Sequence, residues 1–153
     1  MRGGMISDLE AGDEFEPIRY TVTSMMTAEY AHGVEETGEW FLSDDNELGR
    51  QVRIPLMVHA DKMRLLEVNC PGEARLSGKR GPDARVHYEY HARHRSAAFV
   101  GEELVVTGRI LDRYTRRDRV YLHYQMEVRT ADGRLVTEYT DRTLLKYLPG
   151  ALS

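Results

Sequence analysis

The hydrophobic period of this sequence changes once, near Pro71, and the change limits what the chain can fold into. Between residues 55 and 68 apolar residues recur every three or four positions, which is the period of one face of an α-helix. Beyond residue 84 apolar and polar residues alternate in run after run, which is the period of a β-strand with one buried face. The chain is therefore predicted to fold one long helix against a sheet.

The helix is predicted over residues 55–68. Pro55 suits a first helical turn, because the N–H that proline lacks would have no helical partner there in any case. Asn69, Pro71 and Gly72 follow the helix and favour its end. The spacing predicts an apolar stripe that faces the sheet and consists of Leu56, Ala60, Met63 and Leu66.

Four strands are predicted after the helix. In the first, the alternation separates two sets of residues onto opposite faces, Val86, Tyr88 and Tyr90 on one and His87, Glu89 and His91 on the other. The next three strands cover residues 104–110, 120–128 and 135–139. Asp132-Gly133 lies between the last two, and such a pair readily adopts the positive φ angles of a tight hairpin turn.

The residues before the helix are less regular. A strand is predicted over residues 15–22 and a short helix over residues 25–32, with Thr23 or Ser24 as its N-cap. Residues 35–53 are polar and interrupted by glycine, so we expect a long loop there. Loops of this length often carry function.

The predicted order is therefore strand, short helix, long loop, central helix and four strands. For that order, an antiparallel sheet with its helices on one face is the economical packing. We predict one α+β domain over residues 1–153 with the hot-dog arrangement, in which the sheet wraps a central helix. Hot-dog proteins usually join two sheets edge to edge, which covers an exposed strand edge. We therefore expect a homodimer or a higher even oligomer.

Bulk composition argues against some classes of function. A net charge of −4 disfavours sequence-independent binding of nucleic acid, which needs a dense basic surface. No apolar run is long enough for a signal peptide or a membrane span. The single cysteine, Cys70, cannot form an intrachain disulfide. We expect a cytoplasmic protein without a membrane partner.

Several segments, in their order along the chain, resemble the MaoC-like hydratase/dehydratase family over residues 15–147. The resemblance lies in residues 20–23 leading into 30–31, residues 54–57 leading into 63–67, residues 88–91, and residues 101–109. It implies an R-specific hydratase that adds water to a 2-enoyl thioester, or removes water in the dehydratase direction. The substrate would be an acyl-CoA or an acyl-carrier thioester, and no metal or redox cofactor is implied.

The resemblance also implies how the reaction proceeds. In the family an Asp and a His from a G-D-x-N-P-x-H motif activate water and deliver a proton to the α-carbon. Backbone N–H groups at the start of the central helix would polarise the thioester carbonyl. By resemblance, those donors would lie around Leu56 and Met57.

This chain departs from the motif at its histidine. In one alignment, counted from Tyr30-Ala31, Glu36 replaces the motif aspartate and Phe41 replaces the motif histidine. In a second alignment, residues 43–49 lie under the motif and Gly49 replaces the histidine. We prefer the first, because the second leaves too few residues before Pro55. The histidine is missing in both.

The remaining candidates for a site are few. Glu36 is a candidate base if burial raises its pKa, although it could equally be a solvated loop acid. His59 lies one turn into the central helix and could replace the lost histidine, or simply pack there. Trp40 and Phe41 could form a wall of the acyl or pantetheine slot, or anchor the loop to the core.

Other side chains favour different chemistry only weakly. Asp61 and Glu67 resemble the helix carboxylate of hot-dog thioesterases, but their spacing from His59 points them elsewhere. His87 and His91 alternate along a strand without completing a metal-ligand set. Arginines cluster in two places and suit either solvated strand ends or the phosphates of a coenzyme or carrier arm: Arg93 and Arg95, and Arg113, Arg116, Arg117 and Arg119.

Three functional hypotheses follow. The first is a MaoC-like enoyl-thioester hydratase or 3-hydroxyacyl-thioester dehydratase, with its site between residues 35–53 and the central helix. The second is a non-catalytic hot-dog subunit that binds an acyl chain or pairs with an active homologue, which the missing histidine favours. The third is an acyl-thioester hydrolase that uses a helix carboxylate.

Overall fold

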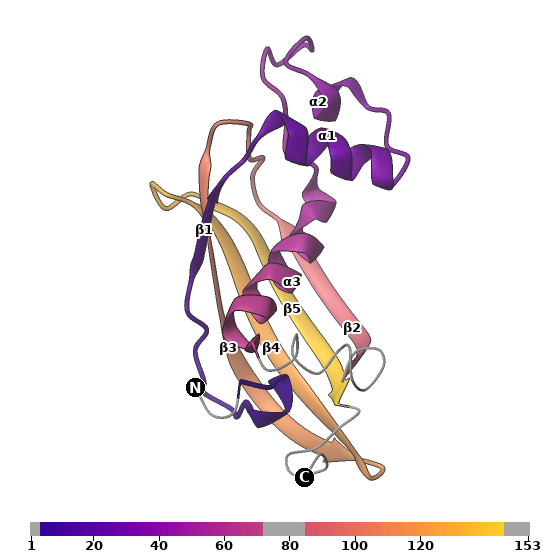
Figure 1. Cartoon of the computed structure of the whole chain (residues 1–153), viewed down its shortest axis with the longest axis vertical. Helices are drawn as coiled ribbons and strands as arrows, with labels where there is room; N and C mark the ends of the chain where they lie inside the picture. Colours follow the sequence, from indigo (N-terminus) through magenta and orange to yellow (C-terminus); the bar gives the residue numbers. More distant parts are fainter. Residues whose placement is uncertain (1–3, 72–84, 146–153) are drawn as a thin grey trace.

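In the computed structural model, which describes residues 4–71 and 85–145, a five-stranded antiparallel sheet wraps one long helix (Figure 1). The strand order is β1-β3-β4-β5-β2. The strands are β1 (Ile18–Thr21), β2 (Arg85–His94), β3 (Glu103–Arg116), β4 (Arg119–Thr130) and β5 (Leu135–Leu145). The α+β hot-dog fold predicted from the change of period is confirmed.

The long helix is α3 (Val58–Asn69), which a 3-10 turn, η2 (Pro55–Met57), precedes. The predicted helix over residues 55–68 is thus confirmed, while Gly72 lies outside the described residues. A short 3-10 turn, η1 (Ile6–Asp8), lies near the N-terminus. None of the described helices is long and apolar enough to cross a membrane.

Two further helices lie across the upper end of the sheet (Figure 1). The first, α1 (Ser24–Gly33), begins as predicted, because the Thr23 hydroxyl accepts a hydrogen bond from the Met26 N–H at 3.2 Å. The second, α2 (Glu39–Leu42), lies inside the segment predicted as a loop. It is a single turn, so no hydrophobic period could have revealed it. We call α1, α2 and the residues between them the overhang.

The face that α3 buries differs from the predicted stripe. Leu56 and Met63 are 45% and 48% exposed, so that part of the prediction is wrong, whereas Leu66 is buried. The helix buries Val58, Asp61, Lys62, Leu65, Leu66 and Asn69. The polar residues of this set are buried because they have partners: Asp61 pairs with Arg53 and Tyr20, Lys62 with Asp141, and Asn69 with the Glu16 backbone. A stripe predicted from hydrophobicity alone leaves them out.

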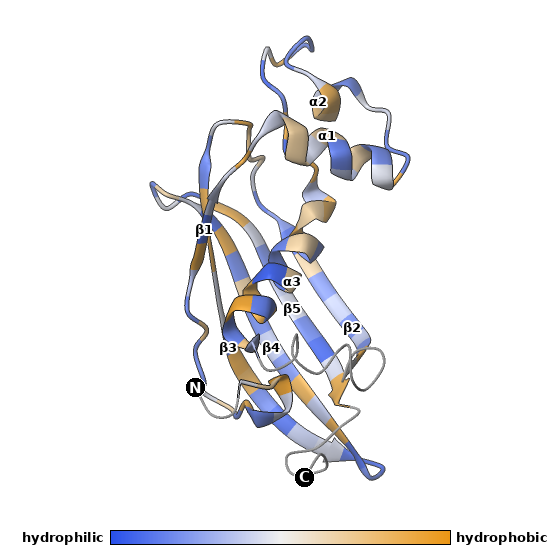
Figure 2. Cartoon of the chain, in the orientation of Figure 1, coloured by the Kyte–Doolittle hydropathy of each residue, from blue (hydrophilic) through white to orange (hydrophobic). Residues whose placement is uncertain are grey.

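Strand β3 passes close beneath α3. A Cβ added at Gly108 would lie 2.8 Å from the Phe15 ring and 3.1 Å from a Leu65 methyl group, so a larger residue would push the helix away. Figure 2 shows hydrophobic residues alternating with hydrophilic ones along β3 and β4, whereas β2 is mainly hydrophilic. The core therefore lies between α3 and the middle of the sheet, and the β2 side is polar.

The alternation predicted for β2 is broken by a bulge. The register with β5 shifts between His87 and Glu89, so Tyr88 adds one residue to the strand. As a result His87 lies on the same side as Tyr90, with ring centroids 5.4 Å apart. Tyr88 instead contacts Tyr121. The predicted grouping of Val86, Tyr88 and Tyr90 on one face is wrong for this reason.

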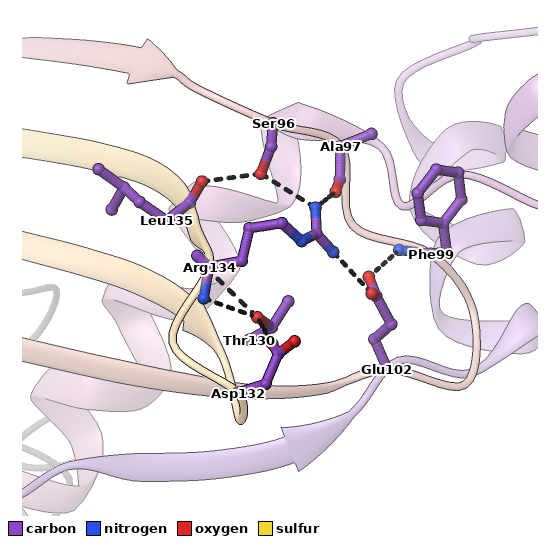
Figure 3. A network of polar contacts seen from close by, with 8 residues as sticks. All are labelled: Ser96, Ala97, Phe99, Glu102, Thr130, Asp132, Arg134 and Leu135. Atoms are coloured by element: carbon purple, nitrogen blue, oxygen red, sulfur yellow. Dashed lines mark hydrogen bonds and ion pairs between the residues drawn. The ribbon is translucent and has the colours of Figure 1, made fainter.

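The predicted hairpin between β4 and β5 is present, with Gly133 at a φ of +96°. Arg134, just after the turn, ties it to the segment before β3 (Figure 3). Its guanidinium donates to the Ala97 carbonyl, to the Ser96 hydroxyl at 3.0 Å and to Glu102 at 2.6 Å. This network fixes the end of the sheet that lies nearest the overhang.

Candidate functional site

A cavity of about 540 Å³ lies between α1 and the first turns of α3. Its lining is largely apolar and includes Met26, Tyr30, Val34 and Met57 from the two helices and the segment after α1. The polar side chains that line it are Tyr20, Glu29, Asp61 and Arg64. A mostly apolar cavity with a few polar groups suits an acyl chain with a polar end.

Asp61, which lines this cavity, belongs to a buried ion pair. The side chains of Arg53 and Asp61 pair directly and are only 1% and 2% exposed. The Tyr20 hydroxyl donates to the other Asp61 oxygen at 2.6 Å, and the Arg53 Nε–H donates to that hydroxyl at 3.1 Å. We call these three residues the closed triad.

Burial raises the pKa of Asp61, while Arg53 and the Tyr20 hydroxyl act in the opposite direction. Burial and the Asp61 charge also raise the pKa of Tyr20. A carboxylate held by two donors inside the protein is poorly placed to activate water against a thioester. Glu67, the other helix carboxylate, is exposed and does not line the cavity.

Glu36 occupies a structural position in the overhang. Its side chain accepts a hydrogen bond from the Gly38 N–H at 2.7 Å, where α2 begins. Its own N–H donates to the Ala31 carbonyl at 2.8 Å, just before α1 ends. Among residues 4–71 and 85–145, no hydrogen bond or ring contact joins Glu36 to His59. Neither residue lines the cavity.

The two aromatic candidates of the overhang differ. Trp40 is 45% exposed. Phe41 packs against the small cluster formed by Ala31, Ile54 and Met57. Phe41 therefore anchors the overhang to the start of α3, while Trp40 presents a large apolar surface to the outside.

The helix start offers few free N–H groups to a substrate carbonyl. Pro55 has none, and the Met57 N–H donates to the Ile54 carbonyl at 3.1 Å. The Val58 N–H is directed back to the carbonyls of Pro55 and Leu56. The Leu56 carbonyl also accepts the Tyr30 hydroxyl at 3.0 Å. Of the two predicted donors, Leu56 and Met57, the second is already engaged within the turn.

A second polar group lies on the other side of α3, centred on Asp141 of β5. Its carboxylate is 1% exposed and lies 2.9 Å from His87 Nε2 and 3.6 Å from Lys62 Nζ. It also accepts hydrogen bonds from the hydroxyls of Tyr139 at 2.7 Å and Thr143 at 2.9 Å. Burial, and then the hydrogen bond to Asp141 and the Asp141 charge, raise the pKa of Tyr139.

His59 completes this group from the helix. Its ring lies edge-on to Tyr90 at 4.7 Å and to Tyr139 at 5.8 Å, and 6.3 Å from the His87 ring. Burial, and then the charge of Lys62, lower the pKa of His59. Because His59 is only partly buried and the His87 side chain is 37% exposed, solvent reaches both imidazoles. We call His59, Lys62, His87, Tyr139 and Asp141 the open cluster.

The sequence predicted His59 but not the rest of the open cluster. The available signal was a carboxylate at position 141, on the strand face that also carries Thr137, Tyr139, Thr143 and Leu145. The bulge at Tyr88, which turns His87 toward Asp141, leaves no local signal. His91 instead pairs with Glu89 at 2.9 Å on the surface. Within the described residues, no three His, Cys, Asp or Glu side chains gather as a metal site would require.

No protein-family model matches this sequence, and no curated protein matches it. Solved structures do match. The MaoC-like dehydratase of Rhodospirillum rubrum has a TM-score of 0.70 at 18% identity, over 92% of this chain and 95% of its own. The (R)-hydratase of A. caviae involved in PHA biosynthesis has a TM-score of 0.69 at 16% identity, over 88% and 96%.

The HadBC (3R)-hydroxyacyl-ACP dehydratase complex of Mycobacterium tuberculosis matches with a TM-score of 0.69 at 15% identity, over 91% of this chain and 99% of the matched chain. At these identities the likeness establishes the fold. This chain has the hot-dog fold of the MaoC-like dehydratases and R-hydratases along almost its whole length.

Proposed function

We propose that this chain, with the fold of the MaoC-like dehydratases, binds acyl thioesters without hydrating them and pairs with a catalytically complete homologue. One observation carries the proposal. The acyl-sized cavity lies on the α1 side of α3, whereas the acid/base groups of the open cluster lie on the β2 side. Hydration needs the bound acyl chain and the acid/base groups to meet at one carbon–carbon double bond.

The overhang supports the same proposal. It has no histidine in the segment that the motif would occupy, and the Glu36 side chain accepts from the Gly38 N–H at the start of α2. The Met57 N–H is also engaged. Thus the base, the acid and one of the two carbonyl donors that the resemblance implies are absent or already engaged.

The cavity suits the acyl end of a thioester. Met26, Val34 and Met57 would contact the chain, and Arg64 lies at the polar side, with its guanidinium 5.1 Å from the Tyr20 ring. An exposed arginine there can pair with the phosphates of coenzyme A or of a carrier-bound pantetheine arm. No metal or redox cofactor is needed for such binding, and we propose a cytoplasmic location.

The pairing would use the free edge of β2. This strand pairs with β5 alone and lies at the end of the sheet. Its exposed apolar side chains are Val86, Tyr88 and Tyr90, at 49%, 59% and 46%. A ten-residue edge with such side chains is a poor surface to leave in water. It suits edge-to-edge pairing with a second copy or with a homologous chain, and one of the matching structures, HadBC, is a complex.

A second candidate function rests on the contact between His87 and Asp141. A buried carboxylate that holds a half-exposed imidazole is a common acid/base arrangement, and His59 lies beside it. In that case the chain itself would be a hydratase, with His59 and His87 as its acid/base residues and Glu36 outside the mechanism.

Cavity blocking tests the binding proposal. Ala60 lines the cavity, so Ala60→Phe should fill part of it and weaken decanoyl-CoA binding by about tenfold or more in calorimetry. Val68→Phe is the matched control, since Val68 is 56% exposed on the same helix and does not line the cavity. Equal affinities for the two variants, with both folded, would refute this acyl site.

Light scattering tests the pairing. The purified chain is expected as a dimer or a higher even oligomer, and replacing Val86 of the free edge, which is 49% exposed, by lysine should shift it toward monomer. A monomeric wild type at micromolar concentration, which also fails to associate with a MaoC-like chain from the same source, would contradict the pairing.

A further inference from the structure

Arginine and tyrosine side chains gather at the tip of the β3–β4 hairpin, at the end of the molecule opposite the overhang (Figure 1). They line a cavity of about 390 Å³ formed by Tyr88, Arg116, Arg117, Arg119 and Tyr121, which we call the Arg-Tyr cavity. Tyr121 alternates with the buried Leu122, so it lies on the sheet face that points away from α3. Neither the closed triad nor the open cluster contributes to this cavity.

The aromatic side chains of this surface form a continuous group. The rings of Tyr114 and Tyr121 stack, with centroids 5.3 Å apart and an angle of 11°. Tyr88 contacts Tyr121 edge-on, also at 5.3 Å. Tyr88 is 59% exposed and lies with Tyr121 on the outer sheet face. Edge-to-edge pairing of β2 joins backbone groups in the plane of the sheet, so it leaves the Tyr88 ring able to receive another flat ring.

The arginines of this cavity are poorly neutralised. Arg116, Arg117 and Arg119 are exposed, and no carboxylate in the described part of the chain pairs with any of them. Two other arginines singled out in the sequence, Arg113 and Arg95, differ. Arg113 donates to the Ser7 and Leu9 carbonyls, and Arg95 pairs with Glu138 at 2.7 Å.

The hairpin holds two of these charges opposite each other. Arg116 and Arg119 are directly paired across β3 and β4, an arrangement in which like charges destabilise a sheet. The two turn residues between them, Arg117 and Asp118, have φ values of +50° and +59°, as a two-residue hairpin turn requires. A bound anion would offset the repulsion between the paired arginines.

We propose that the Arg-Tyr cavity binds a nucleotide. Its phosphates would lie between Arg116 and Arg119, and its base would stack on Tyr88. A small ligand fits better than a long nucleic acid, because the chain as a whole carries a net charge of −4 and a basic surface of three arginines is short. The nucleotide could be free or could be the nucleotide end of a larger coenzyme.

Calorimetry with the full chain tests the proposal, using ADP, pyrophosphate, adenosine, coenzyme A and a short single-stranded oligonucleotide. ADP should bind at one site and more tightly than pyrophosphate or adenosine alone, since both parts of the ligand are recognised. Coenzyme A binding that Arg119→Gln weakens as much as it weakens ADP binding would identify a coenzyme as the source. Coenzyme A binding unchanged in Arg119→Gln would place coenzyme A elsewhere and identify a free nucleotide as the ligand of the Arg-Tyr cavity. A preference for the oligonucleotide would overturn the proposal in favour of nucleic acid.

Substitutions locate the site. Arg116→Gln and Arg119→Gln should each weaken ADP binding about tenfold or more, and Tyr88→Leu should weaken ADP but not pyrophosphate. Arg93→Gln, an exposed arginine on β2, is the matched control. Without ligand, Arg116→Gln should raise the melting temperature, because it removes the like-charge pair. Wild-type ADP affinity in folded Arg116→Gln and Arg119→Gln would overturn the proposal.

Discussion

A buried carboxylate lies on each side of α3, and the two differ in whether their partners reach solvent. On the side toward β1, the closed triad pairs Arg53 with Asp61 out of contact with water. On the side toward β2, the open cluster also buries a carboxylate, Asp141, but its partner His87 and the neighbouring His59 reach solvent. A fully enclosed pair can only support the fold, whereas a buried acid that holds solvent-accessible imidazoles can exchange protons.

This difference bears on the function. The cavity suited to an acyl chain lies over the closed triad, where the acid and the base neutralise each other. The groups able to move protons lie on the side without that cavity. Binding and acid/base chemistry are thus separated by the width of one helix, which is why we propose binding without hydration.

The largest expected effect comes from opening the closed triad. Arg53→Met leaves the Asp61 carboxylate buried without a cation, so it should lower the free energy of unfolding by about 3–5 kcal/mol in urea titrations. Arg19→Met is the control, because it removes an ion pair with Glu103 whose side chains are 63% and 47% exposed and should change stability by under about 1 kcal/mol. Similar losses in the free energy of unfolding for Arg53→Met and Arg19→Met would show that the closed triad is not enclosed.

A smaller loss of stability is expected when the buried carboxylate of the open cluster is removed. Asp141→Ala removes the acceptor of Tyr139 and Thr143 and the carboxylate 3.6 Å from Lys62. Because the Lys62 side chain is 10% exposed and His87 can turn to water, the free energy of unfolding should fall by only about 2–3 kcal/mol. Glu138→Ala, which breaks a half-exposed pair with Arg95 on the same strand, should cost under about 1 kcal/mol. A loss for Asp141→Ala as large as that for Arg53→Met would remove the contrast between the two sides.

The open cluster should also make stability depend on pH. Burial, Lys62 and His87 lower the pKa of His59 below 6.5, against the weaker opposite effect of Asp141. Below about 6.5 the unfolded chain therefore binds more protons than the folded one, so stability falls as the pH drops from there through the folded pKa. His94 and His123, whose pKa values are also lowered by burial, act in the same direction.

His59→Gln should therefore reduce the drop in melting temperature between pH 7 and pH 5, measured by calorimetry. His91→Gln serves as the control, because the His91 side chain is 71% exposed and pairs on the surface with Glu89. If both variants keep the full wild-type drop in melting temperature, the fold does not lower the pKa of His59.

Local patterns in the sequence were enough to predict most of the fold. The helix from Pro55, the Thr23 cap, the hairpin at Gly133 and the long strands each follow from residues close together in the chain. The buried face of α3 could not be predicted from such local patterns. Its buried Asp61 and Lys62 depend on Arg53 and Asp141, and the second of these lies about eighty residues away, beyond the reach of a periodicity argument.

The candidate site was predicted in part. His59 lies in a polar cluster, but its partners His87 and Asp141 meet it through a bulge and a strand pairing that no local pattern encodes. Glu36, Trp40, Phe41, Leu56 and Met57 are placed by the overhang and the helix start. Their roles with a substrate remain predictions.

The central claim is that the chain binds acyl thioesters and does not hydrate them, and a hydration assay beside a binding measurement tests it most directly. Purified wild type should bind a saturated acyl-CoA yet show no conversion of 2-enoyl-CoA thioesters of several chain lengths to the 3-hydroxy products. Wild-type hydration that falls about 100-fold in folded His59→Ala would contradict the claim and establish the open cluster as an active site.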